Sequence, residues 1–167
     1  MGMLRVIVGD DDQAFRNDVA ASLCAVATVI GVATPIETLW TMERTPIDVV
    51  ICDMCLGVSA TGADVLEVVR ERWPRTRFVL LTGFGTIEAA VDAMKRGAWD
   101  YLTKPCDETE LGLVARRAWK EMQAEDEIAR LRSELAESRS FHGIFGRDRR
   151  MLAVFDAIRR VGPSRAS

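Results

Sequence analysis

Five polar residues of this sequence follow short apolar runs, and their types suit phosphoryl transfer. They are Asp10, Asp11, Asp53, Thr82 and Lys104. Three carboxylates can share one place when a divalent cation balances their charge, and Mg²⁺ prefers such oxygen ligands. A hydroxyl and an ammonium beside them suit the oxygens of a phosphoryl group. If the five side chains converge, they form a phosphoryl-transfer site with a carboxylate acceptor.

Asp53 is the candidate nucleophile, because a carboxylate can attack phosphorus and hold an aspartyl phosphate without a separate base. Asp11 is expected to bind Mg²⁺ directly and Asp10 through a water molecule, since Mg²⁺ takes few carboxylates and retains several waters. Asp53 would complete the carboxylate set. The backbone carbonyl of Cys55 is a further candidate metal ligand.

Lys104, Thr82 and Gly83 are the candidates for handling the transferred group. Lys104 and the metal would neutralise charge on the equatorial oxygens of the transition state, where positioning and electrostatics supply nearly all of the catalysis. The Thr82 hydroxyl could donate to the phosphoryl group, and Gly83 would leave room for the donor. Taken singly, an acidic cluster or a Lys-Pro pair after a strand is often only a turn. Their joint position at strand ends favours a site.

An alternation of strand and helix patterns positions these residues. Strands are predicted at residues 4–8, 28–32, 48–53, 78–82 and 99–102, and helices at 13–24, 35–42, 63–72, 86–96 and 108–138. Five such units with right-handed crossovers predict a doubly wound α/β fold with a five-stranded parallel sheet. Open parallel sheets bind ligands beyond the carboxyl ends of their strands, which is where the polar residues fall.

The last predicted helix is too long for this domain. Asp107 and Glu110 resemble a capping box, which marks its start. Beyond Lys120, apolar residues with charged flanks follow the spacing of an a/d coiled-coil seam. The candidate seam is Ala124, Ile128, Leu131 and Leu135. It predicts a linker helix over residues 121–140 that pairs with a second copy of the chain. The alternative is an amphipathic helix that lies on its own domain.

The bulk composition excludes several classes. The chain has 167 residues, a formal net charge of −3 and 49% hydrophobic residues, so neither a basic excess nor a membrane span is indicated. The start enters a strand rather than a signal peptide, so the cytoplasm is the expected location. The four cysteines lack a second ligand pair at zinc spacing, and they are interpreted as small buried apolar residues.

Residues 3–120 resemble the receiver domain of two-component response regulators. The motifs that carry the resemblance are Val-Gly-Asp-Asp-Asp at 8–12, Asp-Val-Val-Ile-Cys-Asp at 48–53, Leu-Leu-Thr-Gly at 80–83 and Gly-Ala-Trp-Asp-Tyr-Leu-Thr-Lys-Pro at 97–105. The resemblance implies a flavodoxin-like receiver over residues 1–120, Mg²⁺ as cofactor, and phosphoryl transfer from a sensor histidine kinase to Asp53. It also implies a phosphoacceptor rather than an enzyme, apart from self-dephosphorylation.

Residues 82–91 resemble the nitrogen-regulator (NtrC) class in particular. Residues 144–147 and 154–161 resemble the beginning of the AAA+ ATPase domain of that class, so residues 141–167 are assigned to its start. The chain ends before a phosphate-binding Gly-rich loop, so no ATPase activity is expected of it. In this class the ATPase acts on polymerase that carries the nitrogen-type sigma factor. Contacts with DNA and polymerase would therefore lie in further domains.

Thr82 and Tyr101 match the coupled switch positions of the family. When Thr82 moves toward the phosphoryl group, Tyr101 can turn inward and alter the face of the fourth helix, fifth strand and fifth helix. Without the family, Tyr101 could equally be a static, half-buried aromatic residue. The resemblance implies that the switch controls homodimerisation, through the linker helix and that face, and the downstream ATPase.

Two features depart from the family pattern. The loop after Asp53 lacks the usual Pro and is one residue longer, since its closing glycine is Gly62. Gly9 replaces a bulky aliphatic residue and is expected to loosen the end of the first strand. Cys55 and Phe84 flank the phosphoryl site, where side chains admit or exclude water.

Two other functions fit part of the sequence. A receiver-like module that mediates dimerisation or other interactions without phosphorylation would accommodate the unusual loop after Asp53. A phosphatase of the haloacid-dehalogenase type would use Asp10 and Asp12, followed by a Thr and a Lys. That phosphatase needs a further acidic pair beyond Lys104, and it leaves Asp53 without a role.

Overall fold

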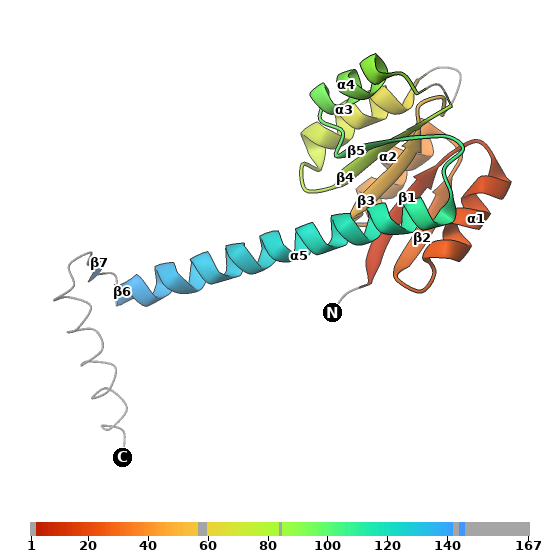
Figure 1. The fold of residues 1–167 in the computed structure, drawn as a ribbon. Helices are drawn as coiled ribbons and strands as arrows, with labels where there is room; N and C mark the ends of the chain where they lie inside the picture. The colour runs from red at the N-terminus through yellow and green to blue at the C-terminus, as the bar shows by residue number, and fades with distance from the viewer. Residues whose placement is uncertain (1–2, 57–59, 84, 142–143, 146–167) are drawn as a thin grey trace. The chain divides into compact units, whose positions relative to one another are not determined.

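The computed structural model describes residues 3–56, 60–83, 85–141 and 144–145. The chain separates into two compact units, Met1–Lys120 and Glu121–Ser167. Strands and helices alternate along the first unit (Figure 1). The strands are β1 (Leu4–Gly9), β2 (Ala27–Val32), β3 (Val49–Asp53), β4 (Arg77–Thr82) and β5 (Asp100–Thr103). The helices are α1 (Gln13–Leu23), α2 (Pro35–Arg44), α3 (Gly62–Arg72), α4 (Ile87–Lys95) and α5 (Glu108–Arg139). The predicted elements are confirmed, with ends that agree within two residues.

The five strands form one parallel sheet in the order β2-β1-β3-β4-β5. The chain starts at β1, beside the central strand β3, moves outward to β2 at one edge, and then crosses back over β1 to β3. This confirms the doubly wound fold. The register places Asp53 opposite Leu81 and Thr82 opposite Thr103. The ends of β3, β4 and β5 therefore meet at one edge of the sheet.

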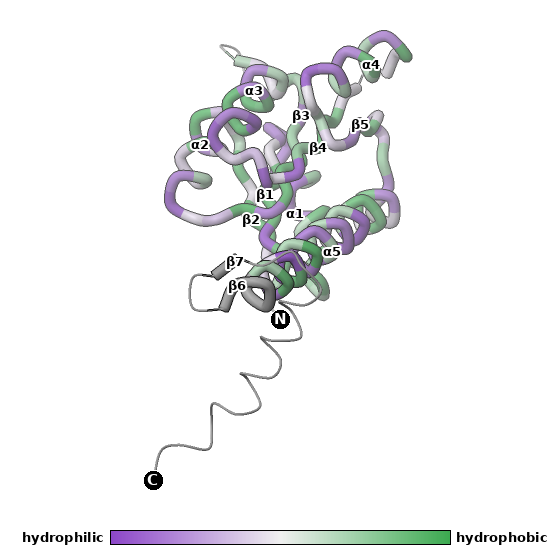
Figure 2. Tube along the Cα trace, turned by 90° about the vertical axis from the view of Figure 1, so that its left-hand side faces the viewer, coloured by the Kyte–Doolittle hydropathy of each residue, from purple (hydrophilic) through white to green (hydrophobic). Residues whose placement is uncertain are grey.

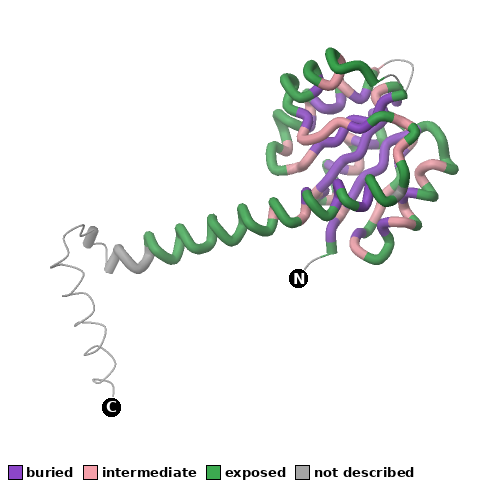
Figure 3. The backbone as a smooth tube through the Cα atoms, viewed as in Figure 1, coloured by how far each residue is buried: buried purple, intermediate pink, exposed green. Residues whose placement is uncertain are grey.

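Helices cover both faces of the sheet, because the strands are continuous apolar runs whose successive side chains point to opposite faces. Hydrophobic residues, green in Figure 2, gather along the strands, and Figure 3 shows that the strands are buried. On one face α1 and α5 pack against the sheet, with a core that includes Val19, Leu111, Val114 and Ala115. On the other face α2, α3 and α4 pack against it, with a core that includes Met42, Val65, Leu66 and Ala93.

Side-chain caps set the starts of the helices. Asp12 accepts hydrogen bonds from the first backbone N–H groups of α1, and Thr34 and Thr86 cap α2 and α4 in the same way. Thr61 and Asp64 form a reciprocal capping box at α3. Gly97 follows α4 with a positive φ of 95°, a conformation that glycine adopts without steric cost.

The second unit contains the remainder of α5 and a short antiparallel pair, β6 (Ser140–Phe141) and β7 (Ile144–Phe145). The four residues of the predicted seam are exposed, and Ile128, Leu131 and Leu135 keep 49%, 45% and 56% of their surface. Most of the predicted start of an ATPase domain, residues 141–167, lies outside the described residues. Among the described helices, none has the length and apolar character required to cross a membrane.

The interpretation of the cysteines as buried apolar residues is wrong for two of the four. Cys52 is fully buried and Cys106 partly so, but Cys24 and Cys55 are exposed. Cys24 is the C-cap of α1, and Cys55 lies in the loop after β3. Both positions follow the end of an apolar element, where the sequence pattern no longer reports burial.

Candidate functional site

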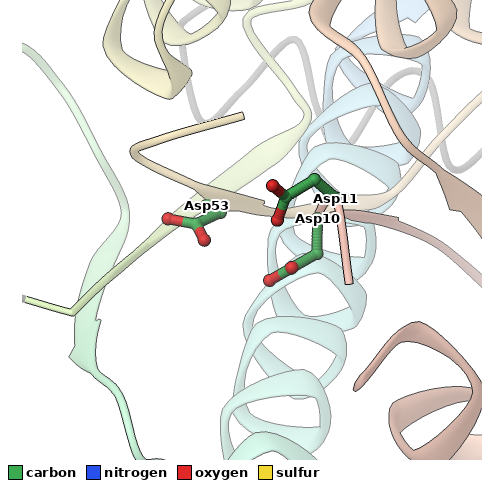
Figure 4. A group of neighbouring side chains, drawn as sticks. All are labelled: Asp10, Asp11 and Asp53. Atoms are coloured by element: carbon green, nitrogen blue, oxygen red, sulfur yellow. The ribbon is translucent and has the colours of Figure 1, made fainter. Parts of the chain in front are cut away.

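Three carboxylates converge at the carboxyl edge of the sheet. Asp10 follows β1, Asp11 is the next residue, and Asp53 is the last residue of β3. One oxygen of each lies within 4.8 Å of the others, and Figure 4 shows the three groups side by side. Asp10 is fully buried, Asp53 retains 7% of its surface and Asp11 is exposed. Two carboxylates thus form the floor of the cluster and the third faces solvent.

Lys104 balances the two buried carboxylates. Its Nζ lies 2.5 Å from Oδ2 of Asp10 and 2.5 Å from Oδ2 of Asp53. The side chain is placed by β5, which ends one residue earlier, and the backbone N–H of Lys104 donates to the carbonyl of Thr82 at 2.7 Å. Burial of the ammonium alone lowers the pKa of Lys104, but hydrogen bonds with Asp10 and Asp53 outweigh it, and the pKa lies above its ordinary value.

The oxygens present fit a hard divalent cation. Carboxylates this close repel one another, and Mg²⁺ would relieve that repulsion while it kept several waters on the exposed side. Oδ1 of Asp53 accepts a hydrogen bond from the backbone N–H of Cys55 at 3.0 Å. This contact brings the backbone of Cys55 to the acceptor, so the carbonyl of the same residue is a candidate ligand.

Asp12 lies outside the carboxylate cluster. Its carboxylate accepts hydrogen bonds from Ala14 and Phe15 at the start of α1, while its own N–H donates to Oδ1 of Asp10 at 2.9 Å. The pair Asp10 and Asp12 that a haloacid-dehalogenase-type phosphatase would use is therefore divided. One carboxylate belongs to the cluster and the other caps a helix.

Thr82 and Gly83 lie at the end of β4 and directly beyond it, and Tyr101 lies on the neighbouring strand β5. Thr82 is the last residue of β4 and keeps 6% of its surface. A Cβ added to Gly83 would meet no atom within 4 Å, so the space beside it is open. Tyr101 lies opposite Leu80 and packs against the core under α3 and α4. Its hydroxyl is buried and has no hydrogen-bond partner among the described residues.

Two residues of α1 that sequence reasoning missed also contact the site. The Arg16 guanidinium donates a hydrogen bond to the backbone carbonyl of Asp10. The aromatic ring of Phe15 lies 4.9 Å from Nζ of Lys104, within the range of a cation–π contact. Their position one helical turn after the acidic residues was the available signal, because the first turn of a helix that follows a strand faces the same edge.

Two close contacts around the loop after β3 were also missed, one made by Gly62 at the start of α3 and one by Leu56. A Cβ on Gly62 would lie 2.3 Å from the carbonyl oxygen of Asp53, so the loop closes against the acceptor backbone only because residue 62 is glycine. Leu56 is fully buried beside Gly9. The expectation that Gly9 loosens the end of β1 is wrong, because Gly9 pairs with Val32 and Cys52 on both sides and Leu56 fills the space.

Comparisons with known proteins agree with this geometry. A family model of the response regulator receiver domain matches residues 6–116. The chain is 32% identical over 145 residues to a putative NtrX-like response regulator of Rickettsia felis, which covers 86% of this chain and 30% of that protein. It is 32% identical over 161 residues to the alginate biosynthesis transcriptional regulatory protein AlgB of Pseudomonas putida, covering 94% of this chain and 35% of that protein.

A solved structure extends the likeness over nearly the whole chain. NtrX from Brucella abortus, in complex with ADP, matches 98% of this chain and 35% of that chain, with a TM-score of 0.72 and 27% identity. The chain thus spans about a third of the length of these relatives. From its family match and its relatives, the chain belongs to the response regulator receiver family and is similar to regulators of the NtrC class.

Proposed function

We propose that this chain accepts a phosphoryl group on Asp53 from the phosphohistidine of a sensor histidine kinase, with Mg²⁺ as cofactor. The observation that carries the proposal is the convergence of three carboxylates within 4.8 Å, with Lys104 bonded to two of them. A purely structural cluster would have no reason to crowd acids at an open edge of the sheet. The family supports the same chemistry.

In the proposed reaction, a carboxylate oxygen of Asp53 forms a bond to phosphorus while the phosphorus–nitrogen bond of phosphohistidine breaks. The electron pair of that bond leaves with the imidazole ring, which takes up a proton from solvent and departs as neutral imidazole, and the attacking carboxylate needs no separate base. Mg²⁺, held by Asp10, Asp11, Asp53 and the Cys55 carbonyl, would supply positive charge for the phosphoryl oxygens. Lys104 would exchange its contact with the acceptor for a contact with those oxygens.

The proposed response starts at Thr82 and passes to Tyr101. The Thr82 hydroxyl would donate to the new phosphoryl group, and Tyr101 would follow on the adjacent strand. The Tyr101 hydroxyl is buried and has no partner among the described residues, which lowers the stability of this side-chain position by about 1–3 kcal/mol and supports its movement. A difference of a few kcal/mol is enough to shift a two-state equilibrium. The shift would alter the face formed by α4, β5 and α5.

Two exposed apolar surfaces support homodimerisation as the output. On α4, Ile87, Val91 and Met94 keep 81%, 46% and 49% of their surface. On α5, the seam residues follow a coiled-coil spacing and are exposed. We expect the dimer to control an AAA+ ATPase domain of the longer parent protein, and this chain to act as an acceptor with self-dephosphorylation rather than as a turnover enzyme.

The first experiment uses the whole chain with Mg²⁺ and a small phosphodonor such as phosphoramidate. Intact mass should increase by one phosphoryl group in the wild type and not in Asp53→Asn, and EDTA should abolish the gain. Asp107→Asn is the matched control, because it changes an aspartate at the start of α5 that caps the helix through the N–H of Glu110. No gain in the wild type would instead favour a receiver-like interaction module.

Sedimentation tests the dimer separately. Leu131→Glu should abolish self-association, because the seam would bury a charge without a partner. Ser133→Glu changes the opposite face of α5 and should leave association unchanged. Equal behaviour of the two variants would exclude the seam as the dimer interface. Comparison of the phosphorylated and unphosphorylated chain then shows whether phosphorylation strengthens or weakens self-association.

A further inference from the structure

We propose that Gly9 and Leu56 form a positioning pair that sets the Cys55 peptide, and with it the metal affinity of the site. The proposal rests on the proposed function, because it concerns the same metal and the same acceptor. In it, the missing side chain of Gly9 makes the space into which Leu56 fits. Leu56 thereby anchors the loop after Asp53, which has no proline to stiffen it.

The contact between the two residues is close. Leu56 lies in a loop and yet has 0% exposed surface. A Cβ built on Gly9 would lie 3.1 Å from Cδ2 of Leu56, 3.5 Å from Sγ of Cys52 and 3.6 Å from Cγ2 of Val32. The Leu56 side chain therefore packs over the end of β1, and a side chain at position 9 would compete with Leu56 for the same volume.

The anchor acts on Cys55 because both of its neighbours in the chain are fixed. Before it, the backbone N–H of Met54 donates to the carbonyl of Leu81 at 2.7 Å, and the Met54 carbonyl accepts from Gly62 at 2.9 Å. After it, Leu56 is held by burial. The Cys55 side chain is exposed, so its peptide depends on these neighbours and on the hydrogen bond to Asp53.

Two departures from the usual receiver sequence, Gly9 and the loop without proline after Asp53, are then explained by the same packing contact. A loop without proline needs another restraint if it is to present a backbone carbonyl at a fixed place. Burial of Leu56 supplies that restraint, and the absence of a side chain at Gly9 leaves room for it. Gly9 and the loop after Asp53 are thus complementary, and a change in one should be corrected by the opposite change in the other.

An exchange of volume tests this pair. Gly9→Val adds an isopropyl group, and Leu56→Ala removes one, so the double variant conserves the total volume. We expect each single variant to weaken Mg²⁺ binding about 10-fold, a size typical of residues that orient metal ligands. The double variant should regain most of that loss. Isothermal titration with Mg²⁺ measures the affinity, and circular dichroism verifies that each variant is folded.

A second readout does not need the metal. The amide resonance of Cys55 in a ¹⁵N-labelled chain reports its hydrogen bond to Asp53, and it should shift in the single variants and return in the double variant. If Gly9→Val does not fold, Gly9→Ala provides a milder step, because only its Cβ meets Leu56. Gly112→Ala in α5 is the control and should change neither readout, since its Cβ meets only the mobile end of Arg116.

The outcomes separate this pair from the function on which it rests. Failure of the wild type to bind Mg²⁺ would overturn the metal-dependent function and the pair together. Normal Mg²⁺ binding by a folded Gly9→Val variant would overturn the pair alone. A double variant no better than the single variants would also overturn it, because that result means general damage rather than competition for one volume.

Discussion

Replacement of Lys104 by methionine should destabilise the domain and make its stability depend more strongly on Mg²⁺. Methionine keeps an apolar chain of similar length and removes only the charge. At an effective dielectric constant of about 20, two carboxylate oxygens that lie within 4.8 Å of each other repel by at least about 3 kcal/mol. In the wild type, the Lys104 ammonium offsets this repulsion from 2.5 Å. The variant leaves the buried carboxylates of Asp10 and Asp53 without that partner.

The expected loss is about 3 kcal/mol of unfolding free energy in EDTA, the low end of the range for breaking a buried ion pair. The low end applies because the Lys104 side chain retains 26% of its surface and is partly screened by water. Saturating Mg²⁺ should restore most of the loss, because a bound cation replaces the missing charge and stabilises the folded state by about 2.7 kcal/mol at a hundredfold excess over its dissociation constant.

Urea unfolding of the wild type and of Lys104→Met, each in EDTA and in Mg²⁺, measures both effects. Lys120→Met is the matched control, because Lys120 is an exposed lysine of α5 whose loss should change stability by less than about 0.5 kcal/mol. If Lys104→Met is as stable as this control in EDTA, the buried carboxylates do not depend on the ammonium. If Mg²⁺ stabilises Lys104→Met no more than it stabilises the wild type, the bound cation does not replace the missing charge of the ammonium.

Three further results are expected. Gly62→Ala should lose about 1–3 kcal/mol of stability in urea, because its Cβ would meet a backbone oxygen at 2.3 Å, whereas Gly112→Ala should gain up to about 1 kcal/mol; equal effects would contradict this. Tyr101→Phe should gain about 1 kcal/mol, since it removes a buried hydroxyl without a described partner, and a loss would mean that the hydroxyl is bonded. In the folded chain, a maleimide should label Cys55 and spare Cys52, because burial and the nearby carboxylates raise the pKa of Cys52; peptide mass spectrometry identifies the labelled thiols, and labelling of Cys52 before unfolding would refute it.

The sheet and the approximate place of the site could be predicted from the sequence because the apolar runs and the polar residues that follow them coincide along the chain. Apolar runs gave the strands, and the rule that parallel strands end at one edge gathered Asp10, Asp53 and Lys104 before any contact was known. Helix starts such as Asp107 were equally visible, because capping is a local interaction. These predictions needed no knowledge of how distant residues touch.

The loop after β3 could not be predicted in the same way. The fit of Leu56 beside Gly9, and of Gly62 against Asp53, depends on volumes that only the packed structure brings together. Read singly, Gly9 indicated a loose strand end, and the loop after Asp53 was seen only to lack the usual proline and to be one residue longer. The position of Arg16 one helical turn after the acidic residues indicated the edge of the site, but not the carbonyl of Asp10 to which its guanidinium donates.

The order of the strands also divides the site into parts of unequal local stability. Asp53 stands at the end of β3, the central strand, whereas Tyr101 lies in β5 at the edge of the sheet and Lys104 directly follows that strand. Amide hydrogens of a central strand exchange with solvent mainly when the whole domain unfolds, and those of a short edge strand exchange through local opening. The acceptor is thus fixed to the strand expected to exchange slowest, whereas Tyr101, at the far end of the proposed response, lies on an edge strand that can open locally while the rest of the sheet stays intact.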